Sequence, residues 1–186
     1  NLRGDLHMHT KDSDGLADAA QMARAAQALG LEYIAITDHS KALSVANGLD
    51  EARLAEQARR LRRLDRKLAN LDLLAGVEVD ILPDGRLDID ASLLAELDWV
   101  VASVHTHFEM GEAEMTQRVL RALESGLVDC LGHPRGRRLG KRAPYPLDLP
   151  KVLAAAKKMD VAVELNSGPN RLDLDAAGCR QAREAG

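Results

Sequence analysis

The strongest constraint on the fold is a regular alternation of short strand-like stretches with longer amphipathic ones. The short stretches have the length and composition of β-strands. They are "RGDLH" (3–7), "YIAI" (33–36), "LLAGVEV" (73–79), "WVVASV" (99–104), "VDCL" (128–131) and "VAVEL" (161–165). Helical patterns cover residues 18–29, 50–71, 113–125, 149–159 and 173–185. Strands joined by helical crossovers lie parallel, so the sequence predicts an α/β fold.

Two helical segments have clear sequence signals. Asp18 is a suitable N-cap for the first, and Gly30 is a suitable C-terminal stop. In the second, one apolar face predicts a single helix over 50–71; it carries Leu54, Leu61, Leu64, Leu68 and Leu71. The arginines between these leucines either bind phosphate or form a solvated outer face, and we favour the solvated face.

Polar residues stand at the carboxyl end of every predicted strand. They are His7 and His9, Asp38 and His39, Glu78 and Asp80, His105 and His107, His133, and Asn166. An open sheet concentrates its ligands at one switch point, whereas a closed barrel brings all strand ends around one rim. The pattern therefore favours a barrel over an open sheet.

Length and composition indicate one soluble domain. A chain of 186 residues can bury a core without disulfides or a structural metal. No apolar run is long enough to cross a membrane, and the two cysteines, Cys130 and Cys179, match no CxxC pattern. We therefore expect a reducing cytoplasmic location and no membrane partner. Aromatic residues make up 2% of the chain, which argues against a stacking platform for single-stranded bases.

Histidines and carboxylates at the strand ends predict a metal centre. Each residue alone has a structural explanation, but all six histidines of the chain lie near a predicted strand end. Alternate residues of a strand point the same way, so His7 and His9 can present two imidazoles to one ion. The candidate ligands exceed one four-coordinate shell and imply at least two ions, with Glu78 placed to bridge them; they are His7, His9, Asp14, His39, Glu78, His105 and His133. Imidazole and carboxylate ligands suit Zn²⁺, Mn²⁺ or Fe²⁺, and the sequence does not choose among them.

Neighbouring metal ions at a solvent-facing rim suggest hydrolysis of a phosphate ester, which needs no protein nucleophile. The chain has no GxSxG, reactive-cysteine or P-loop motif. The loop "RGRRLGKR" (135–142) follows His133 and contains five basic residues in eight. It is either a solvated loop or a phosphate contact, with Arg135 the first candidate because it is nearest a ligand.

Several ordered motifs resemble the polymerase and histidinol phosphatase (PHP) family of metal-dependent phosphoesterases. They are "DLHMHT" with "SDG", "ITDHS", "GVEVDI", "ASVHTHF" and "LGHPRGR". Longer stretches, such as "ITDHSKALSVANGLDEARL" and "VELNSGPNRLDLD", are most similar to the C-terminal PHP domain of bacterial family X DNA polymerases. The resemblance implies a distorted (β/α)7 TIM-like barrel, a trinuclear site, and Mn²⁺-dependent 3′-5′ exonuclease or 3′-end processing activity in DNA repair.

The resemblance also assigns roles to residues. His7 and His9 match ligands of the first ion, Glu78 matches the carboxylate that bridges the first and second, and His105 and His133 match ligands of the second. Asp14 and His39 match ligands of the third, whereas Asp38 and His107 match no ligand position. The family's final motif is an Asp-x-His that follows one further strand, and residues 1–186 stop before any such strand. We therefore expect residues 1–186 to be one PHP domain truncated after its sixth strand-helix unit, with N-terminal polymerase domains elsewhere in the same polypeptide and DNA 3′ ends as substrate.

Three other functions stay open. One is a small-molecule phosphatase of the histidinol-phosphate kind, and another is a non-catalytic structural PHP domain of a polymerase. The third is an amidohydrolase, a class that needs a lysine at the fourth strand end, where this chain has "VHTH". A scaffold would be expected to have lost ligands, yet every family ligand position within this chain still carries its ligand residue, which argues against a scaffold.

Overall fold

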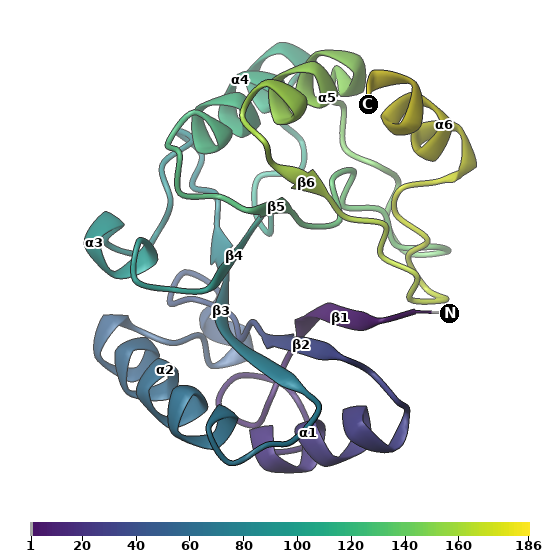
Figure 1. Cartoon of the computed structure of the whole chain (residues 1–186). Coiled ribbons are helices and arrows are strands. Elements are labelled where there is room, and N and C mark those ends of the chain that lie inside the picture. The colour runs from purple at the N-terminus through teal and green to yellow at the C-terminus, as the bar shows by residue number, and fades with distance from the viewer. Residues whose placement is uncertain (1) are drawn as a thin grey trace. The chain divides into compact units, whose positions relative to one another are not determined.

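The computed structural model describes residues 2–186 (Figure 1). In chain order the elements are β1 (Gly4–Met8), α1 (Ala19–Ala28), β2 (Tyr33–Ile36), the 3₁₀ turn η1 (Ser44–Ala46), α2 (Glu51–Asp65), β3 (Asp72–Asp80), α3 (Ala91–Leu94), β4 (Trp99–Ser103), α4 (Glu112–Leu123), β5 (Cys130–Leu131), α5 (Leu149–Lys158), β6 (Ala162–Val163) and α6 (Ala176–Ala185). The strands are hydrogen-bonded in the order β1-β2-β3-β4-β5-β6. The alternation of strands and helices confirms the predicted α/β class.

The chain divides into two compact units. The first extends to Val79 and includes Asp88–Val101, and the second contains Asp80–Leu87 and Ala102–Gly186.

In the first unit, β1, β2 and β3 form a parallel sheet in which Tyr33 pairs with Gly4 and Asp72. Helices α1 and α2 lie on the same side of these strands (Figure 1). The residues buried between the helices and the strands are Ala23, Ala26, Ile34, Ile36, Ala58, Leu61, Leu71, Leu73 and Ala75. Small side chains on the helices allow close approach to the sheet, and each large aliphatic side chain buried there contributes about 1.5–3 kcal/mol.

Helix α2 is shorter than predicted. It begins after the N-cap Asp50 and ends at Asp65, six residues before the predicted end at residue 71. The Asp65 carboxylate accepts a hydrogen bond from the backbone N–H of Leu73, at 2.8 Å, which ties the helix end to β3. Leu71 is nevertheless only 4% exposed. The pattern of leucines continues beyond the end of the helix because the connection to β3 packs on the same apolar core.

In the second unit, β5 and β6 pair in parallel, with Cys130 opposite Ala162 and Leu131 opposite Val163. Both strands are shorter than the predicted ranges 128–131 and 161–165. Helices α4, α5 and α6 follow one another side by side (Figure 1). This unit has its own apolar core, which includes Met115, Leu123, Leu131, Val152 and Leu153.

Arg118 of α4 joins two loops of the second unit. The residue is 2% exposed. Its guanidinium donates to the carbonyl oxygens of Ile81 and Leu82 after β3, and to that of Thr106 after β4. These bonds satisfy the donors of a buried cation and hold both loops against the helix.

Among residues 2–186, none of the helices combines the length and apolarity that a bilayer span requires.

Candidate metal centre

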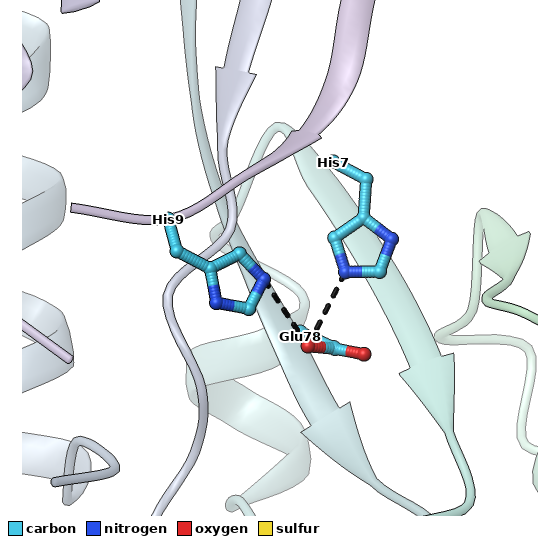
Figure 2. A group of neighbouring side chains, drawn as sticks. All are labelled: His7, His9 and Glu78. Carbon is cyan, nitrogen blue, oxygen red and sulfur yellow. Dashed lines mark ion pairs between the residues drawn. The ribbon is translucent and has the colours of Figure 1, made fainter. Parts of the chain in front are cut away.

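His7 and His9 point toward the buried carboxylate of Glu78 from the end of β1 (Figure 2). Because alternate residues of an extended chain face the same way, the two rings leave on one side and stack, with centroids 5.3 Å apart. His7 Nε2 lies 3.2 Å from Glu78 Oε2, and His9 Nε2 lies 3.3 Å from the same oxygen. The first unit thus brings these three predicted residues together.

His39 and Asp14 complete the group in the first unit. His39 follows β2, and its Nδ1 lies 2.9 Å from Glu78 Oε2. Asp14 lies in the loop after β1, with Oδ1 2.9 Å from His9 Nδ1 and Oδ2 3.7 Å from His39 Nε2. Five of the seven predicted ligands therefore meet within one unit, although they come from three strand ends.

The spacing of these atoms fits shared metal ions. Two ligands that are each about 2.1 Å from one tetrahedral ion lie about 3.4 Å from each other. The ligand atoms of His7, His9 and Glu78 lie within 4.8 Å of one another, as do those of His9, Asp14 and His39. Imidazole nitrogens and carboxylate oxygens suit Mn²⁺, Fe²⁺ and Zn²⁺ alike, so the donors do not identify the metal.

The electrostatics of the group also favour a cation. Glu78 is 1% exposed, and a buried carboxylate is costly unless positive charge or hydrogen bonds compensate it. Burial by itself would lower the pKa of His9, but the hydrogen bond and charge of Glu78, together with Asp14, raise it overall. A proton or a metal ion at His9 supplies the compensating charge, and the two compete for the same ring nitrogens.

His105 and His133 come together in the second unit. Their ring centroids are 5.3 Å apart. His105 Nδ1 lies 2.5 Å from Asp80 Oδ1, a contact that orients the ring and leaves Nε2 as the atom suited to a metal. The backbone N–H of His133 donates to the carboxylate of Glu164, just after β6.

Glu164 is a residue that sequence reasoning missed. Its signal was present, because Glu164 follows the valines of "VAVEL" much as Glu78 lies within "GVEV". Its other carboxylate oxygen accepts a hydrogen bond from Asn166 Nδ2 at 3.2 Å. Glu164 therefore connects the last predicted strand end to His133.

Two strand-end residues that match no ligand position differ from each other. Asp38 is fully buried and accepts hydrogen bonds from the loop that contains Asp14. His107 is exposed and has a left-handed backbone, with φ at 56°.

The basic loop 135–142 is held mainly by its own arginines. Arg137 donates to the carbonyls of Arg171 and Leu172. Arg142 donates to the carbonyl of Gly136 and lies over the Phe108 ring, 3.7 Å from its centroid. Burial, and then the charges of nearby arginines, lower the pKa of Arg142. These side chains stabilise the loop.

Arg135 has a different environment within the second unit. Its backbone N–H donates to Asp173, and its Nε is buried with no hydrogen-bond partner among residues 2–186. The following residues surround a hollow of about 340 Å³, lined by Arg137, Arg138, Leu139, Gly140, Lys141, Arg142, Ala143 and Pro144. Four cations line this hollow, so it suits an anion.

Comparisons with known proteins agree on one family. Residues 5–167 match the family model for the PHP domain. Over its whole length the chain is 45% identical to the DNA polymerase/3'-5' exonuclease PolX of Bacillus subtilis, of which the match covers 32%. It is 34% identical, over 90% of its length, to a probable phosphatase of Aliivibrio fischeri, of which 64% is covered. The chain thus spans from about a third to less than two thirds of the length of these two relatives.

A solved structure shows the same fold. It is a histidinol phosphate phosphatase from Lactococcus lactis, complexed with zinc, L-histidinol and phosphate. The match covers all of this chain and 83% of that one, with a TM-score of 0.66 and 18% sequence identity. This likeness confirms the predicted TIM-like fold of the PHP type.

Proposed function

This chain belongs to the PHP domain family, and from that membership we propose that its metal-dependent phosphoesterase activity acts on phosphodiesters at DNA 3′ ends. The observation that supports the chemistry most directly is the approach of three imidazoles to one oxygen of Glu78. A buried carboxylate surrounded in this way is a site for a cation.

In the proposed assignment, each ligand keeps the role that the resemblance implies. Within the first unit, His7, His9 and Glu78 would hold one ion, and Asp14 and His39 would hold another. In the second unit His105 and His133 would hold a further ion; Asp80 orients the His105 ring, and Glu164 accepts a hydrogen bond from the backbone N–H of His133. When bound, such ions supply a nucleophile at neutral pH and stabilise negative charge on phosphoryl oxygens.

The proposed DNA substrate rests on similarity and charge. The Bacillus subtilis relative is named as a DNA polymerase and 3'-5' exonuclease, and the match covers all 186 residues of this chain. The cationic hollow of the basic loop supports a phosphate contact. Arg135 does not line this hollow, and we propose it as a further contact because it is near His133 in the sequence. We also propose that the same polypeptide carries N-terminal polymerase domains, that Mn²⁺ or Zn²⁺ is the cofactor, and that the protein is cytoplasmic.

A small-molecule phosphatase is the second candidate. It is favoured by the probable phosphatases among the relatives and by the solved histidinol phosphate phosphatase. That reaction would use the same ligands, because phosphate monoesters and diesters need the same kind of charge stabilisation.

One experiment separates the two candidates. The full-length protein is incubated with a 3′-labelled oligonucleotide and Mn²⁺, alone and with an excess of a soluble phosphomonoester. Our proposal expects release of labelled nucleotide that is lost in His9→Ala and is little affected by the monoester. Release that persists in His9→Ala would contradict the metal site, and efficient turnover of the monoester with no release from DNA would favour the second candidate.

A further inference from the structure

The loop after β1, residues 10–15, rests on the buried carboxylate of Asp38. Asp38 is fully buried at the end of β2. It accepts hydrogen bonds from the backbone N–H of Thr10 at 2.7 Å, from Thr10 Oγ1 at 2.6 Å and from Ser13 Oγ at 2.5 Å. One buried carboxylate therefore holds two points of the loop.

Asp14, the next residue of this loop, reaches His9 and His39 with a carboxylate whose side chain is 49% exposed. An exposed side chain has several rotamers available, and ordering it costs conformational entropy. The position of Asp14 therefore depends on how firmly the backbone of loop 10–15 is held.

Gln57 of α2 holds the same loop from the other side. It is 1% exposed and lies on the apolar face of the helix, between Leu54 and Leu61. Its Nε2 donates to Asp38 Oδ2 at 2.6 Å and to Asp12 Oδ2 at 2.8 Å. A single amide group, which has two protons to donate, thus joins two carboxylates that would otherwise repel each other.

The amide of Gln57 is oriented so that Nε2 meets both carboxylates, although this leaves its oxygen without a hydrogen bond from any described residue. The two carboxylates therefore determine its orientation. Gln57 Oε1 is buried and has no hydrogen-bond partner among residues 2–186. Buried polar atoms of native proteins rarely lack a partner. Flipping the amide would not help, because its oxygen would then face Asp12 and Asp38. An apolar residue here would suit the helix face better, so packing does not explain a glutamine.

Two arginines of α2 also bind Asp12. Arg60 Nη2 lies 2.7 Å from Asp12 Oδ2, and Arg53 Nη2 donates to the Asp12 carbonyl at 2.7 Å. These contacts are exposed and compete with water, whereas the amide of Gln57 is shielded from it. Gln57 is thus the buried part of the connection between α2 and the loop.

We propose that Gln57 is a positioning residue of the metal centre: by joining Asp12 to Asp38 it orders loop 10–15 so that Asp14 can bind an ion. This inference rests on the proposed function, because it requires the ligands of the first unit to hold metal. Gln57 itself touches neither an ion nor the substrate.

The first test is a titration of the full-length protein with Mn²⁺, in which free Mn²⁺ is measured by electron paramagnetic resonance. Gln57→Met keeps the approximate length of the side chain and removes its donors. We expect one class of Mn²⁺ to bind about 10–100-fold more weakly, the range found when partners that orient metal ligands are removed. The control is Glu56→Gln, next to it on α2 and exposed, which should leave every affinity unchanged.

A double-mutant cycle tests whether Gln57 acts through Asp14. If it does, Gln57→Met should weaken Mn²⁺ binding strongly in the unaltered protein and hardly at all in an Asp14→Ala background. A general structural role would instead weaken both backgrounds equally. Equal losses, or an unchanged affinity in Gln57→Met, would overturn the proposal.

A variant of Asp12 covers the case in which Gln57→Met fails to fold. The Asp12 side chain is 33% exposed, so Asp12→Ala is expected to fold. It should weaken the same class of Mn²⁺, and unchanged binding would refute the connection through α2. If the unaltered protein binds no Mn²⁺, the proposed function itself fails, a result distinct from tight binding that Gln57 does not influence.

Discussion

Glu78→Gln should separate the stability of the metal-free protein from its response to metal. The carboxylate is 1% exposed and has imidazole nitrogens at 2.9, 3.2 and 3.3 Å. Its desolvation costs several kcal/mol, and hydrogen bonds to a charged group return about 1.5–3 kcal/mol each. These opposing contributions nearly cancel, so we expect the substitution to change the metal-free free energy of unfolding by less than about 2 kcal/mol.

Glu78→Gln should have its larger effect on the stability of the protein when metal is present. An ion present at 100 times its Kd stabilises the folded protein by about 2.7 kcal/mol. For a domain of this size each kcal/mol raises Tm by about 2–4 °C, which gives a rise of about 5–11 °C. Glu78→Gln replaces the carboxylate that three histidines approach with a neutral amide, and the part of the rise that comes from the ion held by Glu78 should disappear.

The assay is thermal unfolding followed by fluorescence, with EDTA in one series and Mn²⁺ in the other. The matched control is Glu124→Gln, an exposed position outside the metal centre, which should keep the full rise in Tm. A Glu78→Gln protein that retains this rise would show that Glu78 is not a ligand. A metal-free Glu78→Gln protein that is unfolded would show that the carboxylate is a structural requirement.

Three further predictions concern single side chains. Burial raises the pKa of the Cys130 thiol to about 12, so at pH 8 Cys130 should react with iodoacetamide much more slowly than Cys179. Mass spectrometry of the native protein measures both rates, and equal rates would contradict the burial of Cys130. Arg118→Met leaves buried carbonyls without a donor and should lower the free energy of unfolding, measured in urea, by about 2–5 kcal/mol. Arg118→Lys should lower it less. A loss below about 1 kcal/mol in Arg118→Met would be inconsistent with the observed hydrogen bonds. Asp18→Ala removes the capping box formed with Gln21 and should cost about 1 kcal/mol while phosphoesterase activity is unchanged; a large loss of activity would contradict a purely structural role.

Some structural relations could not be predicted because they depend on distant contacts. Gln57 contacts Asp12 and Asp38, which are 45 and 19 positions away in the sequence. The sequence does contain a hint, a polar residue on the leucine face of a helix, but it does not indicate which loop that residue meets. The true end of α2 was missed for a similar reason, since Leu68 and Leu71 continue the apolar pattern beyond it.

The alternation of strands and helices, and the polar residues at the strand ends, can be predicted from local sequence patterns. These features follow from periods of about two and 3.6 residues, which depend only on near neighbours. The local HxH pattern likewise determined that His7 and His9 face the same way.

Which side chains meet depends on the folded structure. It brought His39 from the end of β2 and Glu78 from β3 to His9 and Asp14 at the end of β1, and it paired His105 with Asp80. It also placed an amide of α2 between the buried carboxylate of Asp38 and the partly exposed one of Asp12. The physical reason is that these contacts depend on how the crossover helices pack on the sheet, and that packing is set by the whole apolar core rather than by any one segment.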